Sequence, residues 1–473
     1  MKKYLLLTTC LMSIGVNAFS QANFIGTWQG KLNVGITITA VFNITDEGNG
    51  VLSGTMDSPD QGKKGMKCSN VKIKADSLFI EMNKIGGLYA GKMEDASHIN
   101  GIWNQAGRTF PLNLEKVAKV AELNRPQTPK PPFDYLSEDV IYQNADKSIQ
   151  YGATITIPKG KGPFPALVLI TGSGLQNRDE EIAGHKPFAV IADYLTKKGY
   201  VVLRVDDRSM GQSTGDVKNA TTADFAKDVN VSMDYLKSRE EVNKKKLGML
   251  GHSEGGMIAP ILASQRKDID FIVLMAGPGE KITKLMQAQT AAIMESKGMG
   301  KEAIEQYTNL YGNLMQVDLT AKDKTELMEK MTKAVDEWKG KNTAELVAQT
   351  TGIYDEQSEK GFVDEFAAGI SGVWFKYFLS CDPGPYLRKL SCKVLAINGS
   401  KDIQVVSAPN LAGIKASLAK SKSKIYEVKE LPGLNHLFQT CTKCTVEEYG
   451  ELEETMSPLA LQTIGDWLDK NVK

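Results

Sequence analysis

The chain has 473 residues, among them 57 Lys and Arg, 56 Asp and Glu, and four His. This charge balance excludes an overall basic nucleic-acid binder and a protein with an acidic tail. Apolar residues make up 42%, yet no apolar run approaches the roughly 20 residues that cross a bilayer. We therefore expect a globular protein of two or three domains with no membrane span and no nucleic-acid partner.

Residues 1–22 have the features of a cleaved secretory signal. Lys2 and Lys3 give it a positive start, a short apolar stretch runs from Tyr4 to Val16, and small residues lie near two candidate cleavage points. We therefore expect an exported protein, periplasmic or secreted. A buried first helix and lipidation at Cys10 are the alternatives.

Five cysteines remain after residue 22, and in an oxidising compartment some of them can form disulfides. They are Cys68, Cys381, Cys392, Cys441 and Cys444. Five thiols cannot all pair within one chain, although Cys441 and Cys444 could close a small disulfide. No second Cys or His pair stands at ligand spacing, so we expect no zinc site.

Residues 23–118 have an all-β pattern. Short alternating runs, such as 36–44 and 71–74, are separated by Gly-rich turns at 46–50 and 85–87. This pattern predicts seven or eight antiparallel strands in a small barrel or sandwich. The Gly-Thr-Trp opening at 26–28 is similar to small lipocalin-like barrels. A stabilising or spacer module without a ligand is the alternative reading.

The rest of the chain has a different pattern, which begins after a Pro-rich linker predicted at 119–137. From 138 to 473, continuous apolar runs alternate with helical patterns, which indicates a parallel sheet covered on both faces. The runs are Ala166–Ile170, Val201–Val205, Leu247–Leu250, Phe271–Met275 and Val394–Ile397. Between the last two, residues of about 280–391 show helical spacing only, so we expect a helical cap there.

Two Gly-x-Ser-x-Gly motifs offer a nucleophile. Ser253 directly follows an apolar strand and precedes a small apolar helix, the strand–turn–helix corner that lifts a hydroxyl above a sheet. Ser213 lies several residues past its strand and is followed by a polar stretch. We therefore predict that Ser253 is the nucleophile.

A serine nucleophile needs a base and a carboxylate that orients the base. Of the four histidines, His436 comes just after a late strand, at the edge of the sheet where Ser253 is expected. Asp402 follows the strand 394–397 at the same edge, whereas Asp382, the alternative acid, belongs to the return segment of the cap. The order Ser253, Asp402, His436 is that of one hydrolase architecture and of neither common serine-protease fold.

The oxyanion of an acyl transfer needs two backbone donors. One is expected to be the N–H of Glu254, and the other that of Ser173, with Gly174 as the alternate. The Gly-x-Gly at 172–174 lacks the third glycine and the acidic partner of a dinucleotide fingerprint. We therefore expect no cofactor and no metal.

Residues 138–473 resemble the α/β-hydrolase superfamily, most closely its esterase and serine-aminopeptidase-like branch related to dienelactone hydrolases. The resemblance implies acyl transfer to water through an acyl-serine, with Ser253, Asp402 and His436 as the triad and Ser173 and Glu254 as oxyanion donors. Thr171 and Ser209 depart from the family pattern, which commonly has His and Gly there. The matching motifs are Thr171–Gly174, Asp206–Arg208 with Gly211–Ser213, Gly251–Gly256, Asn398–Asp402 and Asn435–Phe438.

The function expected from these features is a serine carboxylesterase that acts on a small acyl ester. A peptidase or thioesterase of the same fold is the alternative within hydrolases. A carbohydrate- or lipid-binding protein led by the β-domain is the alternative from another class. The sequence leaves open the ester, the role of the β-domain and the oligomeric state.

Overall fold

The computed structural model describes residues 21–34, 37–48, 50–59, 63–105, 107–118 and 124–473. The expected signal segment lies outside these described residues except for its last two positions. The chain divides into two compact units, residues 1–123 and 124–473, each with its own hydrophobic core. Among the described helices, none combines the length and the apolar character that a bilayer crossing requires.

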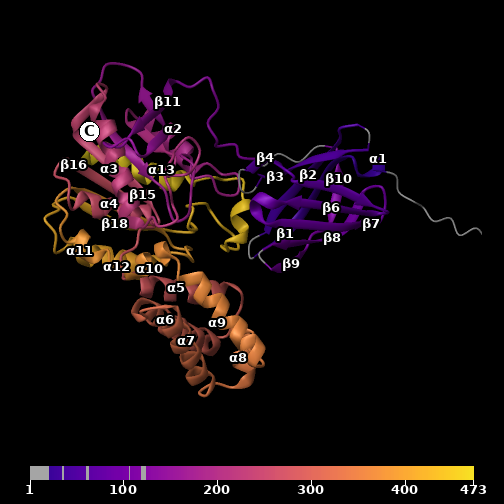
Figure 1. The fold of residues 1–473 in the computed structure, drawn as a ribbon. Helices are drawn as coiled ribbons and strands as arrows, with labels where there is room; N and C mark the ends of the chain where they lie inside the picture. Colours follow the sequence, from indigo (N-terminus) through magenta and orange to yellow (C-terminus); the bar gives the residue numbers. More distant parts are fainter. Residues whose placement is uncertain (1–20, 35–36, 49, 60–62, 106, 119–123) are drawn as a thin grey trace, which may run out of the picture. The chain divides into compact units, whose positions relative to one another are not determined.

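The first unit holds a ten-stranded antiparallel sheet in the order β4-β3-β2-β1-β10-β8-β7-β6-β5, with β9 beside β8 (Figure 1). Trp28, Phe42, Tyr89 and Trp103 fill its core, and the Phe42 and Tyr89 rings lie 5.5 Å apart. Strand β3 contacts β5, so the sheet curls in a barrel-like way. Its strands are β1 Gly26–Asn33, β2 Thr37–Asp46, β3 Leu52–Ser58, β4 Lys63–Lys67, β5 Asn70–Lys74, β6 Ser77–Met82, β7 Gly87–Met93, β8 His98–Gln105, β9 Arg108–Pro111 and β10 Leu114–Val117, and helix α1 (Gln21–Phe24) precedes them.

The second unit is built on an eight-stranded sheet in the order β11-β12-β14-β13-β15-β16-β17-β18. Strands β11 and β12 are antiparallel to their neighbours, and β14 through β18 run parallel. All five predicted apolar runs lie in strands of this sheet. Its strands are β11 Tyr135–Gln143, β12 Gln150–Pro158, β13 Phe164–Ile170, β14 Val201–Val205, β15 Val242–His252, β16 Ile269–Met275, β17 Lys393–Gly399 and β18 Tyr426–Leu431.

Helices cover this sheet, as the apolar runs of its strands predict. Helix α2 packs on α13 and α3 packs on α4. Ser457 is the N-cap of the last helix, because its hydroxyl accepts the Leu459 N–H. The mostly parallel sheet with helices packed on it confirms the predicted α/β-hydrolase fold class. The covering helices are α2 Pro187–Lys197, α3 Thr222–Ser238, α4 Gly255–Ala263, α12 Ser407–Leu418 and α13 Pro458–Asn471.

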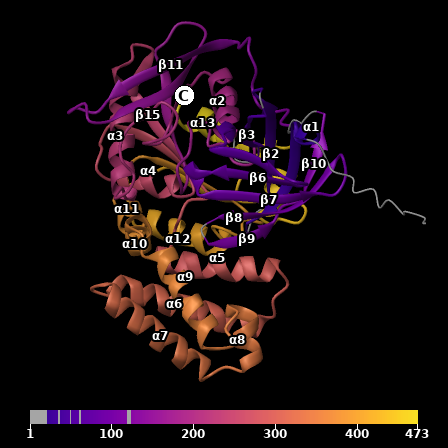
Figure 2. The ribbon, with the colours of Figure 1, turned by 45° about the vertical axis from the view of Figure 1, so that its right-hand side comes forward.

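Seven helices lie between β16 and β17. Helices α6 to α9 form a separate small core around Leu314, Met331 and Trp338, and both views show α10, α11 and α12 between these helices and the sheet (Figures 1 and 2). Trp374 of α10 packs against the main core of the unit. The helices are α5 Ile282–Ser296, α6 Lys301–Thr320, α7 Lys324–Lys339, α8 Ala344–Thr351, α9 Glu356–Ile370, α10 Val373–Ser380 and α11 Gly384–Leu387.

The chain from Asn124 to the start of β11 lies against the second unit. The Arg125 guanidinium donates to the carbonyls of Ala183, Gly450 and Leu452 at 2.8–2.9 Å. Gln127 accepts the N–H of Met456 at 3.0 Å through its side-chain oxygen. These bonds fasten the Pro-rich segment to loops that follow β13 and β18.

Candidate active site

Ser253 lies at a sharp corner between β15 and α4. Its φ is +53°, a left-handed conformation that is rare for a residue with a side chain. A Cβ on Gly251 would lie 2.0 Å from the Gly255 carbonyl oxygen, and one on Gly255 would lie 2.2 Å from the Ile170 oxygen. Neither position tolerates a side chain, so both glycines are required for the corner that places this hydroxyl at the end of the sheet.

His436 and Asp402 meet beside this corner, at the carboxyl ends of β18 and β17. His436 Nδ1 lies 2.8 Å from Asp402 Oδ2. The other carboxylate oxygen, Oδ1, accepts the backbone N–H groups of Gln404 and Val405, both at 2.8 Å. Both side chains are almost fully buried. The carboxylate is therefore fixed in one orientation, with one oxygen held by the backbone and the other facing the imidazole.

The Ser253 corner and the His436 loop are joined through His252, the residue before Ser253. His252 Nε2 lies 2.9 Å from the His436 carbonyl oxygen, and the two rings are 4.7 Å apart. Among the described residues, the Ser253 hydroxyl has no hydrogen-bond partner. Catalytic hydrogen bonds are often long without substrate and tighten when it binds.

The two remaining histidines lie elsewhere. His185 is buried between Thr455 and the Tyr449 carbonyl, and burial lowers its pKa to about 4. His98 belongs to the β-domain, where it pairs with Asp95 on the surface. Of the four histidines, His436 is therefore the one placed beside Ser253 with a ring bonded to an aspartate.

The two rejected alternatives have structural partners instead. The Ser213 hydroxyl is buried, accepts the Gly152 N–H at 2.9 Å and donates to the Asp206 carbonyl at 2.7 Å. Asp382 accepts the Gly384 N–H at 2.9 Å, next to α11. Ser213 thus joins the loop after β14 to β12, and Asp382 stabilises a local turn.

The loop after β13 provides the second set of backbone donors. Gly172 approaches Ser253 so closely that a Cβ on Gly172 would lie 3.2 Å from the Ser253 Cβ. Its own N–H donates to Glu180 Oε1 at 2.7 Å. Within residues 124–473, all described, the N–H groups of Ser173, Gly174 and Glu254 have no acceptor. The donors expected to bind an oxyanion are therefore free.

Two further side chains position this loop and explain one departure from the family pattern. The Thr171 hydroxyl donates to Asp207 Oδ1 at 2.7 Å, and the Gln176 N–H donates to Asp207 Oδ2 at 2.9 Å. The Asp207 carboxylate thus ties both ends of the loop to the end of β14. At the other departure, Ser209 takes a left-handed φ of +64°, which accounts for the glycine that is usual there.

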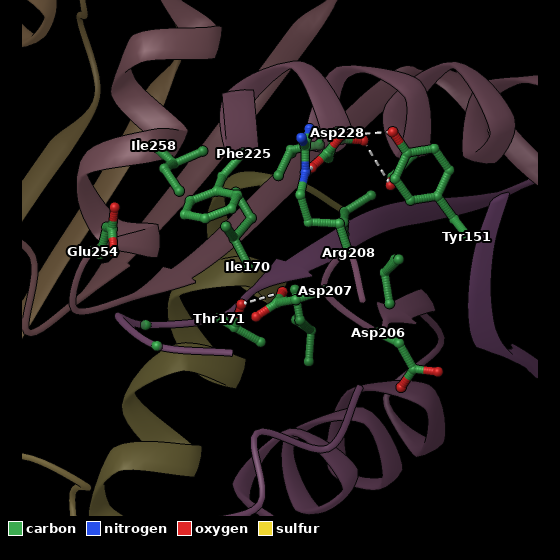
Figure 3. Close-up of a pocket in the computed structure, with 17 residues that line it drawn as sticks. Tyr151, Ile170, Thr171, Asp206, Asp207, Arg208, Phe225, Asp228, Glu254 and Ile258 are labelled. Atoms are coloured by element: carbon green, nitrogen blue, oxygen red, sulfur yellow. Dashed lines mark hydrogen bonds and ion pairs between the residues drawn. The ribbon is translucent and has the colours of Figure 1, made fainter. Parts of the chain in front are cut away.

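A cavity of about 50 Å³ adjoins the loop (Figure 3). Ile170, Phe225 and Ile258 supply apolar walls, while Asp207 and Glu254 supply acidic groups. Figure 3 shows the Asp207 carboxylate turned toward the Thr171 hydroxyl. A small space of this kind has room for a short apolar group.

Glu254 connects the Ser253 corner to the helical cap, and the sequence did not reveal this connection. Its Oε1 accepts the Thr222 hydroxyl at 2.6 Å and the indole N–H of Trp374, on α10, at 3.1 Å. The side chain is buried, and burial raises its pKa. A neutral Glu254 can keep both bonds while carrying no charge into the apolar surroundings.

The buried position of Asp207 predicts a pH-dependent stability. Burial raises its pKa to about 7, whereas an unfolded aspartate ionises near 3.9. Between these values the folded protein holds a proton that the unfolded chain has released, so stability falls as pH rises from about 4 to 7. Asp207→Asn removes this titration, so the loss of stability between pH 4.5 and pH 8 should be smaller by about 3 kcal/mol. Urea unfolding of both proteins at pH 4.5 and pH 8 checks this. An equal change in unfolding free energy between the two pH values in both proteins would contradict it.

Comparison with known proteins agrees with this architecture. A family model described as X-Pro dipeptidyl-peptidase (S15 family) matches residues 148–411, more than half of the chain. The protein belongs to the S15 family. The matched segment contains Ser253 and Asp402 and ends before His436. This S15 member is therefore a hydrolase by family as well as an α/β-hydrolase by fold.

One relative of this S15 member is an esterase. The chain is 26% identical over 330 residues to esterase EstD of Thermotoga maritima, and the alignment covers 69% of this chain and 68% of the esterase. Among solved structures, it aligns with the hypothetical protein PA2218 of Pseudomonas aeruginosa at 16% identity and a TM-score of 0.43, covering 75% of this chain and 99% of that one. It also aligns with the Pyrococcus furiosus esterase Pf2001 at 14% identity and a TM-score of 0.40, covering 72% and 94%.

Proposed function

We propose that this protein is an exported serine hydrolase that cleaves carboxylic esters through an acyl-serine intermediate. The observation that carries the proposal is the Asp402–His436 hydrogen bond beside the left-handed Ser253 corner, with free backbone N–H groups nearby. The relationship to esterase EstD supports the ester as substrate. Ser253, His436 and Asp402 are the nucleophile, the base and the residue that orients the base.

In the first half of the reaction, the Ser253 oxygen forms a bond to the acyl carbon while His436 Nε2 takes the hydroxyl proton. Asp402 keeps the other ring nitrogen protonated and stabilises the imidazolium. The negative charge that develops on the carbonyl oxygen is received by the N–H groups of Ser173 and Glu254, with Gly174 as the alternate donor. The imidazolium then returns its proton to the departing alcohol.

In the second half, water takes the place of the alcohol. His436 removes a proton from the water, its oxygen attacks the acyl carbon, and the carboxylic acid leaves as Ser253 regains its proton. Each half uses the same base and the same oxyanion donors. No further group has to be supplied for the protons and electrons to balance.

A peptidase is the second candidate function, and the description of the S15 family favours it. A dipeptidyl-peptidase has to hold a free N-terminal ammonium, and the acidic side chain nearest Ser253 in sequence is Glu254. Because Glu254 is buried, bonded to Thr222 and Trp374, and raised in pKa, it is poorly suited to pair with a cation. The environment of Glu254 therefore supports an ester substrate over a peptide substrate.

Two measurements test the proposal and separate these candidates. A fluorophosphonate probe, followed by peptide mass analysis, should label Ser253. Turnover of p-nitrophenyl esters from two to twelve carbons should exceed that of an Ala-Pro p-nitroanilide. Faster cleavage of the anilide would favour the peptidase, and an unlabelled Ser253 would contradict both, leaving a binding protein.

Export is part of the same proposal. The charged and apolar features of residues 1–22 support it, and so does a disulfide between Cys441 and Cys444, whose Cα atoms are 5.0 Å apart. Disulfides persist in oxidising compartments such as the periplasm or the extracellular space. Cys68, Cys381 and Cys392 are free thiols.

A further inference from the structure

Glu180 lies in the loop that connects β13 to α2, and no part of the proposed reaction uses it. Its side chain is 1% exposed, although it stands in a stretch of polar residues. Its φ is +51°, which strains a residue with a side chain. A buried carboxylate on a strained backbone indicates that the surrounding contacts determine its position.

Those contacts join two parts of the site at a single atom. Glu180 Oε1 accepts the Gly172 N–H at 2.7 Å and lies 3.0 Å from His252 Nδ1. Gly172 immediately precedes Ser173, whose free N–H is an expected oxyanion donor. His252 immediately precedes Ser253. One oxygen therefore links the oxyanion loop to the nucleophile corner.

The second ring nitrogen of His252 extends the link to the base. Because Nε2 faces the His436 carbonyl oxygen, it must carry a hydrogen. Nδ1 faces a carboxylate, so Glu180 and His252 share one further proton and are neutral as a pair. Burial opposes the charged form of His252, but the Glu180 carboxylate, together with the His436 carbonyl and Asp402, outweighs burial and raises the pKa of the ring.

We propose that Glu180 and His252 are positioning residues that hold the oxyanion loop and the His436 loop in register with Ser253. The inference rests on the proposed function and adds the residues that align its parts. Oxyanion donors act only when they are aimed at the reacting oxygen, and catalytic groups need placement within about 0.5 Å. Without this Glu180–His252 bridge, Ser173 and His436 remain present but are less precisely placed.

Glu180→Gln tests this with almost no change of shape. Because one oxygen receives both contacts, an amide can satisfy only one of them. Its oxygen suits the Gly172 N–H but then requires a charged His252 without a counter-ion, and its NH2 group suits a neutral His252 but repels the Gly172 N–H. We expect kcat on p-nitrophenyl acetate to fall by about 10- to 100-fold, with KM changed less than about threefold.

The matched control is Glu181→Gln, the same change one residue later. Glu181 accepts a hydrogen bond from Asn177 and lies 3.6 Å from the Lys186 ammonium, outside the bridge. Its kcat should equal that of the wild type. All rates are divided by the number of sites titrated with a fluorophosphonate, so a loss of folded protein does not appear as a loss of kcat.

A double-mutant cycle adds a readout that a purely structural role would not give. His252→Gln should lower kcat by a similar factor, and the double variant should be no slower than the slower single variant because both changes break one bridge. His252→Gln also serves if Glu180→Gln does not fold. If Ser253 is labelled but kcat is unchanged in the single variants, this inference alone is overturned. The same holds if the two losses of kcat multiply in the double variant. An unlabelled Ser253 in the wild type would overturn the proposed function and this inference with it.

Discussion

Ser253→Ala is expected to lower kcat for p-nitrophenyl esters by about five to six powers of ten. The substitution removes the atom that bonds the acyl carbon, so the residual rate reflects only the oxyanion donors and substrate binding. The Ser253 hydroxyl has no hydrogen-bond partner among the described residues, and alanine can adopt the same backbone. The free energy of unfolding should therefore change by less than about 0.5 kcal/mol.

Ser213→Ala is the matched control, because Ser213 occupies the same motif and the opposite environment. Its buried hydroxyl makes two hydrogen bonds, and their loss should lower the unfolding free energy by about 1–3 kcal/mol. Its kcat per titrated site should stay at the wild-type value. Ester turnover and urea unfolding of both variants check the pair. Retained turnover in Ser253→Ala would contradict the proposed nucleophile.

The sheet could be predicted where burial is continuous and not where polar residues are buried. Strand β14 coincides with the predicted run, and β13, β15, β16 and β17 contain theirs. Strand β12 was missed because Thr154 and Thr156 give it an alternating, half-exposed pattern. Both threonines are in fact buried, and they bond Asp139 and Thr196. Such partners lie far along the chain, so a local pattern cannot reveal them.

The same reason separates the parts of the site that could be predicted from those that could not. Ser253, Asp402 and His436 each follow a strand of recognisable pattern, so the parallel sheet brings them to one edge. Glu180 and Trp374 have no such signal, since the partners that tie them to the site, His252 and Glu254, are 72 and 120 residues away. One clue existed: His252 ends a strand whose last six residues are buried, and a buried imidazole needs partners at both nitrogens.

Asp402→Asn is expected to lower kcat by about 10⁴-fold, although it changes no more than one atom of the side chain. Asp402 Oδ1 accepts two backbone N–H groups, so the amide oxygen has to take that place. The NH2 group then faces His436 Nδ1 and donates to it, which moves the ring hydrogen to Nε2. A ring protonated at Nε2 cannot accept the proton of Ser253, so the base is lost while the geometry is kept.

Asp382→Asn provides the comparison for this change, because an amide oxygen can still accept the Gly384 N–H there. Its kcat should match the wild type, whereas Asp402→Asn should label with fluorophosphonate at a rate reduced in parallel with kcat. A parallel loss places the defect in the activation of Ser253, which both reactions share. If Asp402→Asn kept its rate and Asp382→Asn lost it, the acid would belong to the return segment of the cap and the Asp402–His436 hydrogen bond would be structural. Two backbone donors fix the Asp402 carboxylate on one side, so it can orient only one tautomer of His436. Because of this restriction, one substitution at Asp402 tests whether Asp402 or Asp382 is the acid.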